Sequence, residues 1–295
     1  MTLRSVRLHS LLGVCFSLCI LLLTLTPHSA RAQTARAPSE TAPLNLLHPQ
    51  RIGADFVGVI SAPLRLEERH YLRLIGFTGL TATLVSSLDA PLYQHAHGGS
   101  TGRPSTSVPH TLAGLGRVYD QIGTSNFVLG TAGAFAATGL LARDDKAVRT
   151  SIRIVEAVAF TKLITGVLKS TIGRARPFTG APSHDANLFE LEFDNPHARR
   201  SMPSGHTSKI FAAASVIAHQ YDTWWVKAPA YATAASAGIQ RIESGKHWFS
   251  DVVVGATLGY LVGKALTQDE QRRSQNRIAY DPILSTRSVG LSLRF

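Results

Sequence analysis

The sequence predicts an all-α protein with, at most, one short β-strand at its C-terminal end. The chain has 295 residues, enough for one good core, and 44% of them are hydrophobic while only 7% are aromatic. Most of it divides into apolar segments of helical length, rich in alanine, glycine, leucine and valine, which favour close helix packing. Residues 287–295 alternate apolar and other residues with a period of two, which is typical of a strand.

The first 32 residues have the pattern of a secretory signal peptide. Arg4 and Arg7 form a positive start, residues 11–25 are apolar, and Ala30-Arg31-Ala32 offers the small residues that signal peptidase requires. We therefore expect an exported, periplasmic protein that is cleaved before Gln33, with a retained membrane anchor as the less favoured alternative. Both cysteines of the chain lie in this segment, so the mature protein would contain no thiol.

The remaining sequence divides into a linker (33–54), a helical domain (55–267) and a tail (268–295). The linker is polar and Pro-rich, as flexible connections are. Helices are expected at residues 55–65, 71–88, 112–122, 126–142, 148–172, 207–221, 228–242 and 248–266, and loops at residues 94–109 and 178–200. The second loop is long enough to act as a lid.

Three histidines accompany the first predicted loop: His95, His97 and His110. A polar loop explains them better than a metal site, because no acidic or cysteine partner lies with them.

After the signal peptide, no segment is a clean apolar run of the length needed to cross a membrane. The predicted helix 148–172 is interrupted by Glu156 and Lys162, and the apolar segment 228–240 is only about three turns long. The pattern therefore favours a soluble or membrane-associated protein over an integral one. The strand-like tail favours a strand laid along the helices or a frayed end, since one strand cannot make a barrel.

The charge balance is basic and dispersed. Lysine and arginine number 30 against 19 acids, a net charge of +11, of which the three arginines of the signal peptide contribute +3. Such a balance suits acidic substrates or an anionic membrane surface. Nucleic acid is not expected as a partner, because no recognition motif accompanies the charge.

The first of three short clusters is Lys169 with Arg176-Pro177. Two cations seven residues apart return to nearly the same face of a helix, so both can point at one anion before Pro177 ends the helix. The guanidinium grips two phosphate oxygens at once, and the ammonium acts as a point charge. The alternative is a solvated basic helix end, which Arg174 would share.

The second cluster is Pro203-Ser204-Gly205-His206 at the start of a predicted helix. Ser204 is a suitable N-cap, and Gly205 lets the backbone come close to a ligand. Free N–H groups at a helix start bind anions, and His206 is placed to deliver a proton to a leaving oxygen. An ordinary capped helix with an exposed histidine is the alternative.

The third cluster is Arg241, His247 and Asp251. Spacing of four on a helix brings the histidine and the carboxylate together, so that Asp251 holds one ring nitrogen and leaves the other free to attack. A surface His–Asp pair is the alternative. A metal site is a poorer interpretation, because Lys169 and Arg176 in the same pocket would repel a cation.

Together the clusters resemble the signature of the type 2 phosphatidic acid phosphatase and vanadium haloperoxidase superfamily. Its pattern is Lys, six residues, Arg-Pro; then Pro-Ser-Gly-His; then Ser-Arg, five residues, His, three residues, Asp. The chain departs from it at Gln240, where the family has serine. The resemblance covers residues 148–267.

The resemblance implies a compact helical bundle with the site at one end. It implies that His247 is the nucleophile that forms a phosphohistidine, that Asp251 orients it, and that His206 protonates the leaving group and then activates water. Phosphate-binding residues would be Lys169, Arg176, Ser204, Gly205 and Arg241. No metal and no cofactor are expected.

The expected activity is metal-independent hydrolysis of a phosphomonoester, small-molecule or lipid, by an exported acid-phosphatase-like or lipid-phosphate phosphatase. The alternatives are a vanadate-dependent haloperoxidase and an integral-membrane phosphatidic acid or isoprenoid diphosphate phosphatase.

Overall fold

The computed structural model describes residues 47–61, 68–97, 116–118, 120–189, 197–275, 279–285 and 288–294. The predicted signal peptide with its cleavage site, most of the linker and His110 lie outside these residues. The helices are α2 (Pro49–Ser61), α3 (Glu68–Thr83), a π-helical turn η3 (Leu84–Leu88), α4 (Asp89–Ala96), α6 (Thr124–Ala142), α7 (Asp145–Ile172), a 3₁₀ turn η5 (Pro177–Thr179), α8 (Gly205–Gln220), α9 (Trp224–Glu243) and α10 (Phe249–Gln275). Residues 116–118 and 120–122 are also helical.

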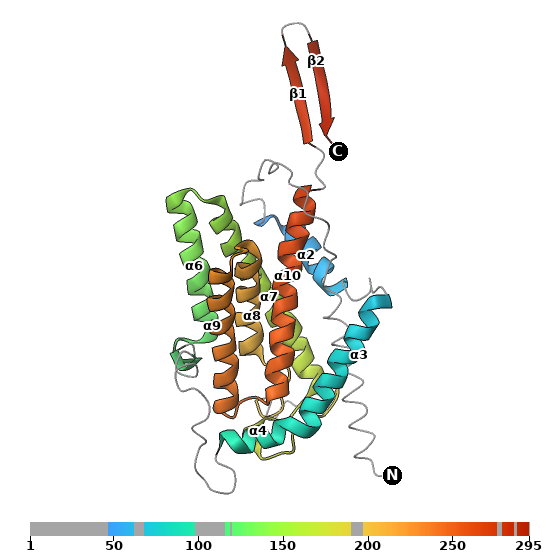
Figure 1. Ribbon diagram of the computed structural model, residues 1–295, viewed down its shortest axis with the longest axis vertical. Coiled ribbons are helices and arrows are strands. Elements are labelled where there is room, and N and C mark those ends of the chain that lie inside the picture. Colours follow the sequence, from blue (N-terminus) through green and yellow to red (C-terminus); the bar gives the residue numbers. More distant parts are fainter. Residues whose placement is uncertain are drawn as a thin grey trace.

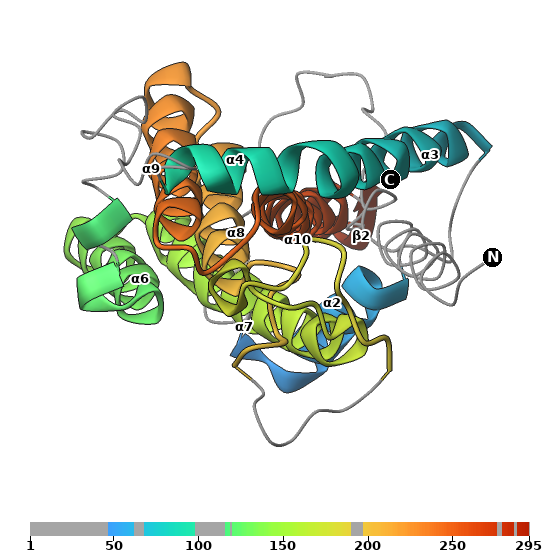
Figure 2. The same cartoon turned by 90° about the horizontal axis from the view of Figure 1, so that it is seen from below.

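The prediction of an all-α bundle is confirmed. Helices α6 to α10 run up and down beside one another, and α3 and α4 cross the bundle at one end (Figure 1). Seen along the bundle, α10 lies between the α3–α4 rod on one side and α7 and α2 on the other (Figure 2). Helix α2 begins at Pro49, inside the predicted linker, and α10 extends nine residues beyond the predicted helix end, to Gln275.

A row of glycines on α10 allows this helix to pack closely against α8. At Gly255, Gly259 and Gly263, an added Cβ would lie 2.6 Å, 2.0 Å and 2.5 Å from a backbone carbonyl oxygen of the segment Ser204–Ala212. Only residues without a side chain allow two helix backbones to approach so closely. The row therefore sets α10 against α8, and with it the relative position of the site residues at their N-terminal ends.

Local sequence explains where the long helix α7 begins and ends. Asp144 is its N-cap and accepts hydrogen bonds from the backbone N–H groups of Lys146 and Ala147. Gly173 ends the helix in the left-handed conformation, with φ 55°. An added Cβ there would also lie 2.4 Å from the carbonyl oxygen of Asn187, so the position requires glycine on two counts.

A buried ionic cluster fastens α2 to α7. The guanidinium Nη1 of Arg153 lies 2.6 Å from Asp55 Oδ2 and 2.6 Å from Glu156 Oε2. Arg153 is only 1% exposed, so removing its guanidinium would leave the two acids buried side by side without a compensating charge.

The α3–α4 rod contains a π turn next to a proline. Pro91 has no N–H to donate to the carbonyl group four residues earlier, and the helix widens at Leu84–Leu88, just before Asp89. Asp89 is buried, with 1% of its surface exposed, rather than ending the helix at the surface. The predicted helix 71–88 therefore continues to Ala96, into the segment expected to be a loop.

The expectation that the mature chain has no helix suited to crossing a membrane is wrong. Among the described residues, three helices are long and apolar enough by length and composition: Tyr71–Ala96, Thr124–Ala142 and Phe249–Gln268. The first was missed because Asp89 resembles an interruption, although it is paired inside the protein. The first two also have large apolar side chains on the surface, such as Leu72, Ile75, Leu129 and Leu141.

The predicted C-terminal strand is present as β2 (Ser288–Arg294). It pairs antiparallel with a second strand, β1 (Ala279–Ser285), with Ala279 opposite Arg294 and Ser285 opposite Ser288. The tail is therefore a two-stranded hairpin beyond the end of α10, not a single strand laid along the helices (Figure 1). The first strand was not predicted, because Pro282 interrupts its pattern.

Candidate active site

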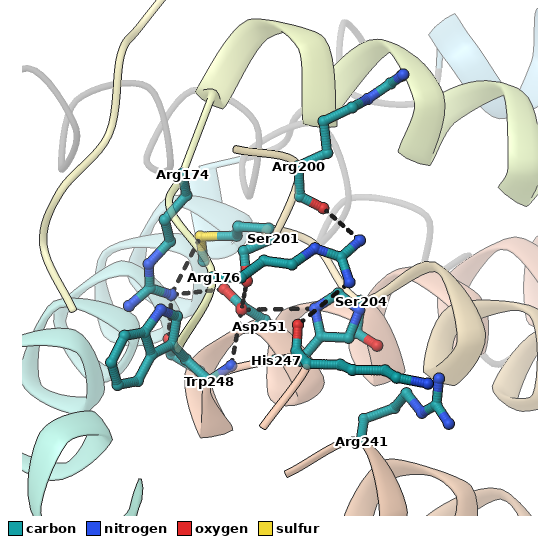
Figure 3. A network of polar contacts seen from close by, with 12 residues as sticks. Arg174, Arg176, Arg200, Ser201, Ser204, Arg241, His247, Trp248 and Asp251 are labelled. Carbon is teal, nitrogen blue, oxygen red and sulfur yellow. Dashed lines mark hydrogen bonds and ion pairs between the residues drawn. The ribbon is translucent and has the colours of Figure 1, made fainter. Parts of the chain in front are cut away.

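The residues of the three sequence clusters meet at one end of the bundle. They come from the C-terminal ends of α7 and α9, the N-terminal ends of α8 and α10, and the short segments that follow α7 and precede α10. Figure 3 shows several of them around His247 and Asp251. Two helix N-termini point their partial positive charge into the same region, which favours an anion there.

His247 and Asp251 lie side by side, but not on one helix as predicted. His247 precedes α10, and Asp251 lies in its first turn. His247 Nδ1 is 3.6 Å from Asp251 Oδ2, longer than a hydrogen bond but close enough for strong electrostatic interaction. Because Nδ1 faces the carboxylate, Nε2 is the nitrogen available to attack a phosphorus atom.

The Asp251 carboxylate is held by several donors. Oδ2 accepts hydrogen bonds from the Ser201 hydroxyl at 2.5 Å and from the Trp248 backbone N–H at 2.9 Å. Oδ1 pairs with Nη1 of Arg174 at 2.5 Å. The Trp248 contact also caps the start of α10, so the carboxylate is fixed by the same interaction that begins the helix.

The two cations of the first cluster converge by a route that differs from the prediction. Helix α7 ends at Gly173, and Arg176 lies in an extended segment with φ −83° and ψ 154°, so the two side chains do not share a helix face. Lys169 Nζ donates to the carbonyl oxygens of Arg200 (2.6 Å) and Ser201 (3.1 Å). Arg176 reaches the Arg200 carbonyl oxygen at 3.4 Å.

The third cation, Arg241, is held at the end of α9 by Gln240 and Asp120. Its Nη2 lies 2.5 Å from Asp120 Oδ1, and its Nε donates to Gln240 Oε1 at 2.6 Å. Gln240 Nε2 in turn donates to Asp120 Oδ2 at 3.2 Å. The glutamine that replaces the family's serine is therefore part of a closed triangle around Arg241.

Helix α8 begins at Gly205, two residues earlier than predicted, and Ser204 holds the N-cap position. Its side chain does not cap the helix, which corrects the prediction: the Ser204 hydroxyl lies 2.9 Å from the Thr207 hydroxyl, while the Ser204 N–H donates to the Asp251 carbonyl oxygen. At Gly205 an added Cβ would lie 3.5 Å from Lys169 Cε. The turn thus runs directly against the Lys169 side chain.

Burial sets the protonation of both histidines. It lowers the pKa of His247 to about 3, although Asp251 opposes the shift. Burial, together with the positive charges of Arg241 and Lys209, lowers the pKa of His206 to about 3. Both rings are therefore neutral near pH 7. Burial and Arg176 also lower the pKa of Lys169 to about 7, so this lysine is poised to gain its full charge beside an anion.

Several functional neighbours were not predicted: Arg174, Asp89, Ser201 and Asp120. Arg174 was recognised only as a basic residue at a helix end. Arg174 follows Gly173, which ends the helix, and precedes Arg176 by two residues. This position was the signal that its side chain points away from the other two cations. Asp89 and Asp120 carry no local signal, because their contacts reach Arg174 and Gln240 across 85 and 120 residues of sequence.

The described residues contain no group of three histidine, cysteine or acidic side chains placed to hold a metal ion. Of the three histidines first considered, His97 lies at the end of α4, with Nδ1 2.9 Å from the Tyr93 carbonyl oxygen and Nε2 3.0 Å from that of Glu243. The predicted lid is described only in part; Arg199 pairs with Asp185 at 3.1 Å across it.

A bundle end that gathers three cations, two histidines and one oriented carboxylate is suited to binding phosphate or a similar oxyanion. Residues 150–275 match the family model described as the PAP2 superfamily. This region holds all eight predicted site residues, and the match confirms the resemblance to this superfamily found in the sequence.

Curated relatives include a lipid A 1-phosphatase of Porphyromonas gingivalis, 42% identical over 69 residues that make up 23% of this chain and 16% of the relative. Lipid A 1-phosphatases of Rhizobium johnstonii and Rhizobium etli are each 34% identical over 106 residues, 35% of this chain and 40% and 42% of the relatives. The chain thus spans less than half the length of these relatives.

Two solved structures are similar to the structure of this chain. A transmembrane PAP2 type phosphatidylglycerolphosphate phosphatase from Bacillus subtilis has a TM-score of 0.49 and 22% identity, covering 69% of this chain and 96% of that one. LpxE of Aquifex aeolicus has a TM-score of 0.44 and 22% identity, covering 62% of this chain and 96% of that one.

Proposed function

We propose that the protein is a metal-independent phosphatase that hydrolyses a lipid phosphomonoester through a phosphohistidine on His247. The observation that carries this proposal is the pairing of a buried, neutral His247 with Asp251 inside a ring of cations. Positive charge is already supplied by Lys169, Arg176 and Arg241, in the place where phosphoryl transfer needs it.

The chemistry follows from the geometry in two steps. Nε2 of His247 attacks phosphorus, the bond to the leaving oxygen breaks, and His206 gives that oxygen a proton. Asp251 stabilises the positive charge that develops on the ring. Water then attacks the phosphohistidine, His206 takes a proton from it, and the P–N bond breaks to release phosphate.

His206 must be protonated to act as the acid in the first step. Its low pKa comes from burial and from Arg241 and Lys209, so a bound phosphate dianion, which neutralises that positive field, raises the pKa of His206. The acid is thus charged only when substrate is present, and the neutral nucleophile His247 is preserved beside it.

A lipid substrate is supported by two observations. The curated relatives are named lipid A 1-phosphatases. Two of the three helices suited to a membrane, Tyr71–Ala96 and Phe249–Gln268, carry Asp89 and Asp251 into the site itself. A site built from the ends of membrane-spanning helices lies near the membrane–water interface, where the phosphate groups of lipids are found.

The activity is tested with purified protein in detergent and EDTA. Phosphate release is expected from lipid phosphomonoesters without added metal, and vanadate is expected to inhibit it, because vanadate binds as an analogue of the transferred phosphoryl group. Loss of activity in EDTA that a divalent ion restores would overturn the metal-independent mechanism. Halide oxidation that requires vanadate and peroxide would favour the haloperoxidase alternative instead.

We also propose that the protein is exported, processed near Gln33 and held in the membrane by the three apolar helices. Cell fractionation is expected to find it in membranes, resistant to carbonate and high salt and released by detergent, with a mature N-terminus close to Gln33. Release by carbonate alone would show that the helices do not span the bilayer, and an intact N-terminus would show that the segment is a retained anchor.

A further inference from the structure

We infer that Arg174 is a positioning residue of the site: held by Asp89 on α4, it fixes the carboxylate of Asp251 and thereby the nucleophile His247. This inference deepens the proposed function and rests on it, since it assigns a new residue to the same reaction. Arg174 contacts the Asp251 carboxylate, which in turn faces His247, so its action on the nucleophile is indirect.

The contacts of Arg174 use all sides of its guanidinium. Nη1 donates to Asp251 Oδ1 at 2.5 Å and to the Ser250 hydroxyl at 2.7 Å, and Nη2 lies 2.7 Å from Asp89 Oδ2. Nε donates to the Ser183 carbonyl oxygen at 2.8 Å. The side chain is 1% exposed and lies against the Trp248 ring, 5.6 Å from its centroid. A planar, permanently charged fork is the group that can meet this many acceptors at once.

Asp89 supplies the second half of this arrangement. Its Oδ1 accepts from the backbone N–H of Ser250 at 2.9 Å, and its Oδ2 accepts from the Ser250 hydroxyl at 2.5 Å. Asp89 therefore binds the first turn of α10 as well as Arg174. The Ser183 hydroxyl also donates to the Val85 carbonyl oxygen at 3.0 Å, which fastens the π turn to the same place. Through these bonds, the docking of the apolar α3–α4 rod and the placement of Asp251 depend on one another.

The geometry shows why Asp251 needs this partner. Ser201 and the Trp248 N–H hold Oδ2, the oxygen that faces His247 Nδ1, while Arg174 holds the other oxygen. With both oxygens bound, the carboxylate cannot rotate about its axis. Without the guanidinium, Asp251 and Asp89 would also face each other as two buried like charges, an arrangement that is strongly unfavourable.

Arg174 also tunes the charge that His247 experiences. The charged and titratable groups around the His247–Asp251 pair are Asp89 from α4, Lys169 from α7, Arg174 and Arg176 from the segment after it, His206 from α8 and Arg241 from α9. Arg174 compensates Asp251 directly. Removing its charge leaves the carboxylate more strongly negative toward the imidazole, which favours the imidazolium and raises the pKa of His247.

The test compares Arg174→Lys and Arg174→Gln with a matched control, Arg153→Lys. Arg153 is equally buried, also pairs with two carboxylates, and lies away from the site. We expect kcat on a lipid phosphate to fall about tenfold in Arg174→Lys and about 100-fold in Arg174→Gln, with KM little changed, because misplacing a reacting group by about 1 Å costs roughly this much. Arg153→Lys should lose thermal stability and keep its kcat.

The pH profile gives a readout that a merely structural role would not move. Because attack requires neutral His247, a raised pKa moves the acid limb of kcat/KM to higher pH in Arg174→Gln, and less in Arg174→Lys, which retains a charge. The acid limb of Arg153→Lys should match that of the wild type. An unchanged kcat and acid limb in Arg174→Lys, or the same kcat loss in the control, would overturn the inference.

Two further measurements test the role of Arg174 independently of the proposed phosphatase activity. If Arg174→Gln does not fold, Arg174→Lys and Asp89→Asn decide the outcome, and Asp89→Asn is expected to lower kcat in the same direction. The titration of the His247 ring by NMR needs no substrate: its midpoint should rise in the Arg174 variants. Wild-type protein without activity on any phosphate ester would refute the proposed function, while an unmoved His247 titration would refute the role of Arg174.

Discussion

Replacing His247 with alanine is expected to abolish phosphate release. The attacking nitrogen is lost, so a phosphohistidine can no longer form at the position that faces Asp251. We expect kcat to fall by at least about three orders of magnitude, as it does when a nucleophile that acts with its neighbours is removed. The measurement is steady-state phosphate release from a lipid phosphomonoester, together with trapping of a phosphoenzyme in the wild type.

A matched control is His219→Ala. His219 lies in the last turn of α8, at the opposite end from His206, and its Nδ1 is 2.7 Å from the Ser215 carbonyl oxygen. This variant should retain nearly full kcat and a phosphoenzyme that can be trapped. If His247→Ala kept more than about a tenth of the wild-type kcat, His247 would not be the nucleophile.

The site illustrates what local sequence predicts well. Lys169, Ser204, His247 and Asp251 were selected by spacing, and each lies at the same end of the bundle. The residue types were sufficient because the chemistry of a phosphate site restricts them strongly. Local geometry was predicted less well: Gly173 rather than Pro177 ends α7, and the Ser204 hydroxyl contacts Thr207 instead of capping α8.

What the sequence did not predict depends on contacts between distant segments. Arg174 resembles any basic residue at a helix end until Asp89, 85 residues earlier, is seen to pair with it. The same contact explains why the first of the three helices suited to a membrane, Tyr71–Ala96, was missed. An aspartate within an apolar segment lowers the expectation of a span, but a carboxylate that is neutralised inside the protein leaves the outer face of the helix apolar.

Replacing His206 with alanine is expected to slow hydrolysis in a way that depends on the leaving group. An alkoxide is a strong base and needs a proton as it leaves, whereas p-nitrophenolate needs almost none. We therefore expect His206→Ala to lower kcat/KM for a lipid or alkyl phosphate about 100-fold or more, and for p-nitrophenyl phosphate much less. The measurement is kcat/KM for both substrates in the wild type and the variant.

The pH dependence of the reaction tests the same role of His206 as a general acid. In the enzyme–substrate complex, the bound dianion raises the pKa of His206 from its low value of about 3, and activity on alkyl phosphates falls as the pH rises through the new pKa and the acid is lost. In the pH profile of kcat, which reports the enzyme–substrate complex, that alkaline limb should be present in the wild type with alkyl phosphates and absent in His206→Ala. A matched variant, His219→Ala, should keep it. Equal losses on both substrates, with the alkaline limb intact, would mean that His206 only binds the phosphoryl group and that another residue protonates the leaving oxygen.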